Sequence, residues 1–432
     1  MPNIVLRHIS HPPLPRGLSD MAFTADSDND HSETTANPDA FVDEDPRVHV
    51  VTTFDDMPLN HKLIRGIYSN GFETPSPIQQ RTITPIVEGH DVIGQARSGT
   101  GKTGAFSIGT LQRLDWSTAL RRVPQALVLS PTRELAQQTY DVMSVLGEYL
   151  SDGQPFCHLF VGGTKVADDV RKLQAGTMVA VGTPGRVTDL VKRGMLRTGS
   201  FKIIVLDEAD ELLSQGFAEQ VVEIFRYVPR DVQIALFSAT MPPSVLELSG
   251  KFMRDPICVL VRTESLTLKG IKQFYVAIEE ENKLEALMDL YESVSVAQSV
   301  IFANTRRKVD YISARLNANN HTVSLLHAEM PKGDRDRVMR SFRSGSSRVL
   351  VATDVVARGI DVHHVNIVVN YDLPDNIQNY LHRIGRSGRY GRKGVAINFV
   401  SHADRSLLRD LEGHYRMVVD ELPMNFAEHL AV

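Results

Sequence analysis

The stretch that decides the fold runs from residue 91 to residue 111 and reads Asp91-Val92-Ile93-Gly94-Gln95-Ala96-Arg97-Ser98-Gly99-Thr100-Gly101-Lys102-Thr103-Gly104-Ala105-Phe106-Ser107-Ile108-Gly109-Thr110-Leu111. A short apolar run predicts a strand, a glycine-rich loop follows it, and helical spacing begins at Gly104. This is the context of a P-loop, in which backbone N–H groups and a helix N-terminus bind phosphate. A chance glycine-rich turn is the alternative, and the strand–loop–helix order argues against it.

The loop predicts a nucleoside triphosphate and a divalent cation as ligands. Lys102 is placed to reach the β- and γ-phosphates, and the Thr103 hydroxyl is placed to hold Mg²⁺. Ala96 stands where this motif usually has glycine. The predicted ATP contacts in the loop are Ala96, Arg97, Ser98, Gly99, Thr100, Gly101, Lys102 and Thr103.

A P-loop of this kind needs an acidic residue at the end of a neighbouring strand. The run Ile203-Ile204-Val205-Leu206-Asp207-Glu208-Ala209-Asp210 supplies one. We expect Asp207 to hold the Mg²⁺ shell and Glu208 to orient and polarise the attacking water. The alternative is the acidic start of a solvated helix, since acidic residues favour helix N-termini. The P-loop in the same chain favours the catalytic interpretation.

Outward from these motifs the pattern is α/β. Short β-branched runs end in Gly, Thr, Ser or Asp and alternate with amphipathic stretches, as in a parallel sheet covered by helices. The predicted strands form two series of about five: 91–94, 126–130, 178–182, 203–207 and 234–238, then 299–303, 323–326, 348–353, 366–370 and 395–400. The pattern predicts two doubly wound domains, at residues 49–260 and 271–432, joined by a polar linker at 261–270.

The first 48 residues differ in composition from the rest. They hold three arginines against nine acidic residues, a net charge of −6, and show no sustained helical or strand period. Such a segment is expected to be a disordered acidic tail. The acidic part begins after Met21, so Met21 is an alternative start of the chain.

Composition excludes several classes of protein. The chain has two cysteines, Cys157 and Cys258, which leaves no disulfide framework or cysteine-rich metal module. No apolar run approaches the roughly 20 residues of a membrane span, and the proline-containing N-terminus has no signal-peptide core. Residues 49–432 carry a net charge of +1, so a polyanion site has to be built locally. A reducing compartment is expected.

Asp-Glu-Ala-Asp at 207–210 is the signature of the DEAD-box RNA helicases, and the chain resembles that family from about residue 50 to residue 432. Further motifs of the family follow in order: Gly71-Phe72 through Pro77-Ile78-Gln79, Pro131-Thr132-Arg133-Glu134-Leu135, Gly162-Gly163, Thr183-Pro184-Gly185-Arg186, Ser238-Ala239-Thr240, Ile301-Phe302-Ala303-Asn304-Thr305, Thr353 to Asp361, and His382-Arg383-Ile384-Gly385-Arg386-Ser387-Gly388-Arg389. The resemblance implies two tandem RecA-like domains and an RNA-stimulated ATPase that binds RNA without sequence preference and locally unwinds duplexes.

Within the family the chain is most similar to the branch that acts in translation initiation. Ser238–Pro242, Asn304–Asp310 and Ala357–Asp361 favour that branch, while Ser387 and Phe399 favour the exon-junction branch or are neutral. The first branch implies a cytoplasmic monomer that acts on single-stranded and duplex mRNA with scaffold and activator proteins of a cap-binding complex, and with no membrane. The second implies a nuclear ATP-dependent RNA clamp in splicing or quality control.

The resemblance assigns roles at the nucleotide. It implies that Gln79 reads the adenine edge, that Phe54 stacks on the base and that Asp361 binds the ribose. Core packing is the alternative for Phe54. Arg386 and Arg389 would act as arginine fingers, so that the catalytic set is Lys102, Asp207, Glu208, Arg386 and Arg389. His382 would couple the domains through Ser238, Ala239 and Thr240.

It also implies a groove in which backbone amides, hydroxyls and arginines contact phosphate and sugar. The expected RNA contacts are Pro131, Thr132, Arg133, Gly163, Thr183, Pro184 and Arg186 from the first domain, with Arg335, Thr353 and Asp354 from the second. The chain departs from the family at Lys332, where glutamine is usual, and at Ala328-Glu329, where Gly-Asp is usual. These departures leave the catalytic residues unchanged, and Lys332 is expected either to add a phosphate contact or to disturb a hydrogen bond that steadies Arg335.

Only one P-loop is present, and the second series of strands has none. The second domain is therefore expected to complete the ATP site of the first. If ATP and RNA both bridge the domains, each should raise the affinity for the other. An RNA clamp that unwinds little and a P-loop ATPase acting on protein partners are the rival functions.

Overall fold

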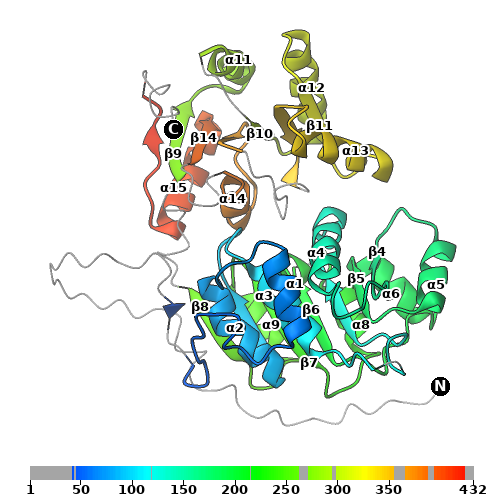
Figure 1. Cartoon of the computed structure of the whole chain (residues 1–432). Coiled ribbons are helices and arrows are strands. Elements are labelled where there is room, and N and C mark those ends of the chain that lie inside the picture. Colours follow the sequence, from blue (N-terminus) through cyan, green and yellow to red (C-terminus); the bar gives the residue numbers. More distant parts are fainter. Residues whose placement is uncertain are drawn as a thin grey trace, which may run out of the picture.

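The structure is a computed structural model of the whole chain, and it describes residues 41–42, 45–117, 119–214, 216–261, 271–293, 298–354, 365–387 and 394–423. Two separate β-sheets are each covered by helices, and they lie one above the other in Figure 1. The first sheet belongs to residues 41–261 and the second to residues 271–421. The predicted α/β class and the two tandem RecA-like domains are confirmed.

The first sheet contains eight strands in the order β1-β8-β2-β7-β6-β3-β5-β4. All neighbouring pairs are parallel except β1 with β8. The strands are β1 (Phe41–Val42), β2 (Val92–Gln95), β3 (Ala126–Leu129), β4 (Cys157–Phe160), β5 (Val179–Gly182), β6 (Ile203–Asp207), β7 (Gln233–Ser238) and β8 (Ile257–Val261). The P-loop strand β2 lies between β8 and β7, and β6 follows β7.

Successive residues of these strands enter two different cores, as a sheet buried on both faces requires. In β6, Ile203 and Val205 pack in the first core, while Ile204 and Leu206 pack in the second. The helices that cover the sheet are α1 (His61–Ser69), α2 (Pro77–Glu88), α3 (Lys102–Arg113), α4 (Arg133–Leu146), α5 (Val166–Ala175), α6 (Pro184–Lys192), α7 (Ala209–Leu212), α8 (Ala218–Phe225) and α9 (Pro243–Ser249). Side chains of α1 to α4 fill the first core, and those of α6 to α9 fill the second.

The second sheet has seven strands in the order β11-β12-β10-β13-β14-β9-β15, and every pair is parallel. The strands are β9 (Ile271–Ala277), β10 (Ser299–Phe302), β11 (Val323–Leu326), β12 (Val349–Ala352), β13 (Ile367–Asn370), β14 (Gly394–Val400) and β15 (Asp420–Glu421). The helices are α11 (Lys283–Ser293), α12 (Arg306–Ala318), α13 (Lys332–Arg343), α14 (Ile377–Ile384) and α15 (Arg405–Tyr415). Short 3₁₀ turns at Glu280–Asn282 and His402–Asp404 precede α11 and α15.

Every predicted strand has a counterpart, but each sheet contains more strands than the five expected. Sequence analysis missed β1, β4, β8, β9 and β15. The two central residues of β4 are partly exposed, and in β9 only Ile271 and Phe274 are buried, so neither gives a continuous apolar run. The apolar strand β8 ends the first domain and has no loop-and-helix pattern after it, which removed the usual signal of a βα unit.

The folded part begins before residue 49, where the predicted tail was expected to end. Phe41 and Val42 pair antiparallel with Val261 and Leu260, which covers the β8 edge of the sheet. Arg47 then forms ion pairs with Asp45 and, across the domain, with Asp255. The disordered state of residues 1–40 stays a prediction, because it falls outside the described residues. The predicted linker does so as well from residue 262 to residue 270.

Among the described helices none is long and apolar enough to span a membrane.

Candidate active site

The carboxyl ends of β2, β7 and β6 lie side by side, and each carries a predicted catalytic segment. The P-loop follows β2, Ser238 ends β7, and Asp207 ends β6. In a parallel sheet these ends meet at one edge, where ligands bind. The strand order therefore brings the phosphate loop and the acidic motif together although about 100 residues separate them in sequence.

The P-loop has the backbone that phosphate binding requires. Gly99 and Gly101 have φ of +81° and +100°, values that residues other than glycine rarely adopt. Helix α3 begins directly afterwards at Lys102, so its N-terminal N–H groups point at the loop. The Lys102 ammonium is buried, and Nζ donates to the Ala96 carbonyl at 2.7 Å.

A cavity of about 420 Å³ opens over this loop. Gln79 forms part of its wall, where it links helix α2 to the P-loop: Oε1 accepts from the Ser76 N–H at 2.8 Å, and Nε2 donates to the Gly101 carbonyl at 3.1 Å. A Cβ at Gly101 would lie 2.7 Å from Gln79 Nε2, so this close approach requires glycine. Gln79 is thus placed beside the phosphate loop as well as near the predicted base position.

The structure places the predicted adenine-stacking residue inside the core. Phe54 has no exposed surface and packs edge-to-face against Tyr68 and Phe72. The aromatic ring in the cavity wall is Phe72, one layer further out. A base stacked on Phe54 would require this layer to shift, so the role of Phe54 stays a prediction, and Phe72 is the ring that a base meets in this conformation.

The two acidic residues at the end of β6 face the same cavity. Burial first, and then the neighbouring Glu208 carboxylate, raise the pKa of Asp207 to about 7, although Lys102 acts in the opposite sense. Asp207 Oδ2 is buried and has no hydrogen-bond partner among the described residues. Glu208 adopts the left-handed conformation (φ 51°, ψ 57°), which is rare outside glycine, and it lines the cavity.

These observations fit a bound divalent cation. A buried carboxylate oxygen with a raised pKa is stabilised when a cation is placed beside it. Thr103 lines the same cavity and offers a hydroxyl oxygen, the ligand type that Mg²⁺ prefers. The two predicted metal ligands, Thr103 and Asp207, therefore share one wall.

Helix α14 brings the second domain to this cavity. Arg386 lines it and is buried, and its Nε donates to the His382 carbonyl at 2.9 Å. His382 Nε2 lies 3.1 Å from Asp210 Oδ2, and the Thr240 hydroxyl donates to the same oxygen at 2.6 Å. Of the predicted coupling residues, Thr240 and His382 thus meet through Asp210, a residue to which we had given no role, while no contact of Ser238 or Ala239 with Asp210 or His382 is among these hydrogen bonds. Asp361 and Arg389 lie outside the described residues.

A second cavity, of about 650 Å³, lies between the domains near the other end of the same sheet edge. The loops that follow β3 and β5 line it, together with Gly162 from the loop after β4, as their neighbouring positions in the sheet dictate. Seven of the predicted RNA contacts are among its lining residues: Pro131, Thr132, Arg133, Thr183, Arg186, Arg335 and Asp354. Gly163, Pro184 and Thr353, also predicted, are not among them. We call this cavity the groove.

The groove contains residues that sequence analysis missed, namely Gly162, Gly185, Glu211, Phe217, Gln220 and Asn379. Gly162 and Gly185 belong to the family motifs quoted above, so their place in those motifs could have identified them as groove residues. Gly163 stays close to the groove: its φ is +84°, and a Cβ there would lie 3.0 Å from Arg133 Nη1. The glycine pair therefore lets the Arg133 guanidinium lie flat over the loop.

An ion pair crosses between the domains at the groove. Arg335 Nη2 donates to Glu134 Oε2 at 2.7 Å, and both side chains are almost fully buried. Glu134 follows β3 in the first domain, and Arg335 lies in the first turn of α13 in the second. Arg335 was expected to contact RNA alone, and the structure shows that it also joins the domains.

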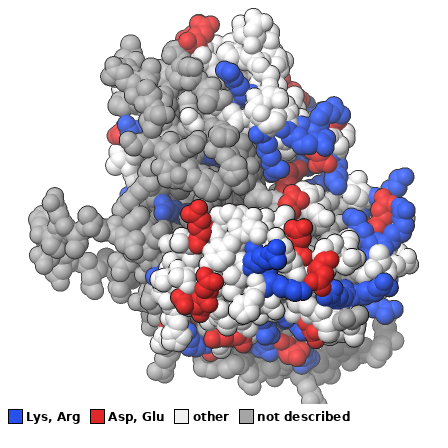
Figure 2. Space-filling view, viewed as in Figure 1, with Lys and Arg blue, Asp and Glu red and all other residues white. Residues whose placement is uncertain are grey.

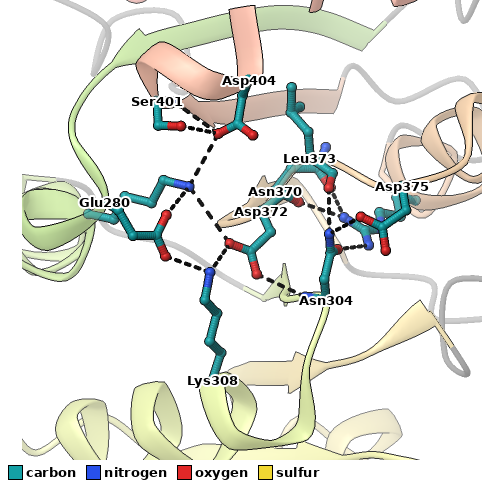
Figure 3. A network of polar contacts seen from close by, with 11 residues as sticks. Glu280, Asn304, Lys308, Asn370, Asp372, Leu373, Asp375, Ser401 and Asp404 are labelled. Carbon is teal, nitrogen blue, oxygen red and sulfur yellow. Dashed lines mark hydrogen bonds and ion pairs between the residues drawn. The ribbon is translucent and has the colours of Figure 1, made fainter. Parts of the chain in front are cut away.

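A buried polar network holds α14 in place (Figure 3). Arg383 has no exposed surface and lies 5.3 Å from the centroid of the Phe302 ring. Its guanidinium donates to Asp354 at 2.5 Å, to the Asp372 carbonyl at 2.7 Å and to Asn304 at 2.7 Å. Arg383 thereby ties a groove residue, Asp354, to the helix that carries His382 and that ends two residues before Arg386.

The outer part of the same network is ionic. Lys283 is 1% exposed, with Glu280, Asp404 and Asp372 at 2.8, 3.6 and 3.7 Å from Nζ. Lys308 contacts Glu280 at 2.5 Å and Asp372 at 2.6 Å, and Figure 3 shows Asp372 between Lys308 and Asn304, whose backbone N–H donates to the Asp372 carboxylate. Burial alone would raise the pKa of Glu280, but hydrogen bonds from Lys283 and Lys308 hold it below its ordinary value.

Basic side chains gather on one side of the molecule, over α12 and α13 above and over α5 and α6 below (Figure 2). Helix α13 alone carries Lys332, Arg335, Arg337, Arg340 and Arg343 against two aspartates. A nearly neutral protein thus concentrates positive charge locally, as the even charge balance of residues 49–432 had required.

Comparison with known families assigns both domains. Residues 76–248 match the DEAD/DEAH box helicases, and residues 282–391 match the helicase conserved C-terminal domain. The chain belongs to the DEAD-box helicases. A probable eukaryotic initiation factor 4A of Trypanosoma cruzi is 65% identical over 91% of this chain and 96% of its own length. The ATP-dependent RNA helicase eIF4A of Sclerotinia sclerotiorum is 55% identical over 88% of this chain and 94% of its own.

This DEAD-box helicase is an ATP-dependent RNA helicase of the eIF4A type and an RNA-stimulated ATPase. Its fold matches S. cerevisiae Dbp5 bound to RNA and ADP BeF3, with a TM-score of 0.81 and 35% identity over 88% of this chain and 98% of that one. One superposition covers both domains, so their relative arrangement is close to that of the RNA-bound relative.

Proposed function

We propose that this helicase unwinds structure in mRNA 5′ leaders during translation initiation, by closing its two domains around Mg²⁺-ATP and RNA. The observation that carries the proposal is a shared cavity: Lys102, Asp207 and Glu208 of the first domain line it together with Arg386 of the second. The groove bridges the same two domains through Arg133 and Arg335. Both ligand sites are therefore complete only in one arrangement of the domains.

In the first step the P-loop takes the phosphates. Backbone N–H groups at 99–103 surround them, and Lys102 exchanges its Ala96 partner for phosphate oxygens. Thr103 and Asp207 would hold Mg²⁺, which offsets charge on the phosphates when bound. Phe72 and Gln79 line the end of the cavity beside α2, where we place the base.

In the second step the chain's own residues support hydrolysis. The buried Glu208 carboxylate orients water and accepts its proton, and the left-handed backbone at Glu208 directs it into the cavity. Arg386 stabilises charge on the transferring phosphoryl group with a planar, permanently charged guanidinium. The His382–Asp210–Thr240 contact holds α14 against the acidic motif, so that Arg386 arrives only when the domains close.

RNA enters the same cycle through the groove. Hydroxyls, backbone amides and arginines contact phosphate and sugar, which makes binding indifferent to base sequence. Closure on RNA favours ATP binding and closure on ATP favours RNA binding, because both use the same state. Release of phosphate would reopen the cleft and free the RNA.

The proposal extends to the cellular setting. The protein would act as a cytoplasmic monomer that works with scaffold and activator proteins of a cap-binding complex, a setting proposed because its relatives carry the name initiation factor 4A. The exon-junction alternative, an RNA clamp that holds RNA without turnover, gains no support from these relatives. A pull-down that recovers cap-binding scaffold proteins would support the first setting, and recovery of exon-junction proteins would support the second.

The activity is tested with purified full-length protein. ATP hydrolysis is measured with and without single-stranded RNA, and strand separation is followed on a short labelled duplex. We expect RNA to stimulate hydrolysis and ATP to be required for separation. Hydrolysis unaffected by RNA would favour an ATPase acting on proteins, and stable RNA complexes that outlast phosphate release would favour a clamp.

A further inference from the structure

Arg186 lines the groove, but most of its hydrogen bonds are already used within its own domain. Nη1 donates to the Thr164 hydroxyl at 2.9 Å and to Asp169 Oδ2, and Nη2 donates to the Thr164 carbonyl at 2.8 Å. A guanidinium has five N–H groups. Three are used here, which leaves the Nε hydrogen and one hydrogen of Nη2 for a ligand in the groove.

The residue that fixes this orientation is Asp169, in the first turn of α5. Its side chain is 0% exposed, whereas that of Arg186 is 10% exposed. Oδ2 binds Arg186, while Oδ1 has no hydrogen-bond partner among the described residues, with Lys172 Nζ 3.9 Å from the carboxylate. Lys172 itself donates to the Leu159 carbonyl at 3.0 Å, so it is held to β4 and cannot replace Arg186.

The same contacts set the shape of the glycine loop. Thr164 follows Gly162 and Gly163 directly, and both its hydroxyl and its carbonyl accept from Arg186. Gly162 lines the groove, and the Arg133 guanidinium lies over the pair. A change in the Arg186 orientation would therefore move two further groups of the groove wall.

We propose that Asp169 is a positioning residue for RNA: it holds Arg186 so that the two remaining N–H groups face an RNA phosphate, and it fixes the Gly162–Thr164 loop through the same guanidinium. The inference rests on the proposed RNA-binding function and deepens it. Asp169 never touches RNA in this arrangement. The negative charge of Asp169 by itself would weaken RNA binding, because RNA is a polyanion. Its hydrogen bond to Arg186 gives a reason for a buried carboxylate beside the groove.

Charge and geometry predict opposite signs for one substitution. Asp169→Asn keeps the size of the side chain and an oxygen acceptor, and removes the negative charge. If the charge acted only through space, the variant would bind RNA more tightly. If Asp169 positions Arg186, the weaker neutral hydrogen bond loosens the guanidinium, and we expect the RNA dissociation constant to rise about tenfold.

The adjacent residue provides a matched control. Asp168 lies on the same helical turn, its side chain is 44% exposed, and it pairs with Arg171. Asp168→Asn removes the same charge near the groove without touching Arg186, so we expect less than about a twofold change, toward tighter binding. Asp169→Glu restores the charge on a longer side chain and should recover part of the affinity.

The experiment measures binding of a fluorescent single-stranded RNA with a nonhydrolysable ATP analogue, for the wild type and all three variants at several salt concentrations. Losing one phosphate contact should reduce the slope of log affinity against log salt by about 0.7 in Asp169→Asn alone. A fall in the folded fraction would leave that slope unchanged. The KM for ATP without RNA should also stay unchanged, because the nucleotide cavity is separate.

Weaker RNA binding with a reduced salt slope in Asp169→Asn, and not in Asp168→Asn, supports the proposal. Equal or tighter binding in Asp169→Asn overturns it, and so does weaker binding with an unchanged slope. If the wild type itself fails to bind RNA, the proposed function fails instead, so the two failures are distinguishable.

Discussion

The two domains share one fold and use it in different ways. The first carries the P-loop, the acidic motif and most of the groove on loops at one sheet edge, and glycines with positive φ let backbone approach the ligands. The second, on a sheet of seven parallel strands, contributes Arg335 from α13, His382 from α14 and Arg386 from just beyond α14, and each is held by a buried polar contact. The first domain thus binds phosphate largely through backbone N–H groups. The second domain contributes arginine and histidine side chains, which the surrounding protein must hold in place.

The largest effect should come from removing the arginine side chain that the second domain contributes to the ATP cavity. Arg386→Ala removes the guanidinium that enters the cavity of the other domain, and we expect RNA-stimulated hydrolysis to fall by roughly 10³-fold or more. ATP binding to the first domain should persist. RNA affinity, with and without a nonhydrolysable ATP analogue, measures the coupling, which should weaken. Equal tightening in variant and wild type, with stimulation intact, would show that the two domains do not share the site.

The next effect tests a catalytic residue of the first domain. Glu208→Gln retains the size and the backbone position of the side chain but loses the carboxylate that accepts the water proton, so hydrolysis should slow at least about 100-fold. Binding of ATP and of RNA should remain. Single-turnover hydrolysis and filter binding separate these quantities. Near-normal turnover would mean that another residue is the base.

A third change tests the buried ion pairs that stabilise the second domain. Lys283→Met leaves Glu280, Asp372 and Asp404 without their shared buried cation, and we expect a loss of about 3 kcal/mol in the stability of the second domain. Thermal unfolding followed by circular dichroism measures it. Lys308→Met, at a side chain that is 36% exposed, should cost less.

The stability of the wild type and that of Lys283→Met should depend differently on pH. The pKa of Glu280 is lowered in the folded state, so its contribution is present above its unfolded pKa and is lost as pH falls through the folded value. Acid should therefore destabilise the wild type below about pH 4, and Lys283→Met should show a flatter response there. An equal response in both proteins would remove Lys283 from the cause.

The smallest effect concerns the departure at Lys332. Its side chain lies half-buried at the start of α13, and Arg335 is already held by Glu134 across the domains. We therefore expect Lys332→Gln to change RNA affinity by less than about twofold and the salt slope only slightly. A tenfold change, measured by fluorescence anisotropy, would show that Lys332 supports Arg335 or contacts phosphate itself.

Local sequence was enough to predict much of the first domain. The P-loop and the Asp207-Glu208 pair are short contiguous segments whose chemistry depends on spacing within a few residues, and each follows a short strand that begins with apolar residues. Phe54 shows where that reasoning ends, because an aromatic residue at a domain start has the same sequence whether it packs in the core or faces a ligand. Only the positions of Tyr68 and Phe72 place its ring inside.

The contacts of the second domain depend on distant partners and were less predictable. Arg335 with Glu134 and Arg383 with Asn304 join residues 201 and 79 positions apart, and no periodicity reports such a pair. The role of Asp210 was hidden for the same reason, since its partner His382 lies 172 positions away. Sequence motifs marked these arginines and this histidine as special without saying which ligand or neighbour each one meets.

The contact between Lys102 and the Ala96 carbonyl has a consequence for how ATP binds. With this hydrogen bond at 2.7 Å in a buried loop, one of the three N–H donors of the ammonium already has a partner before any phosphate arrives. Binding is then a substitution, and its free energy is the difference between two well-made contacts. The resting loop thus folds its own lysine back onto the backbone, so part of the free energy of the new phosphate contact offsets the loss of the Ala96 contact.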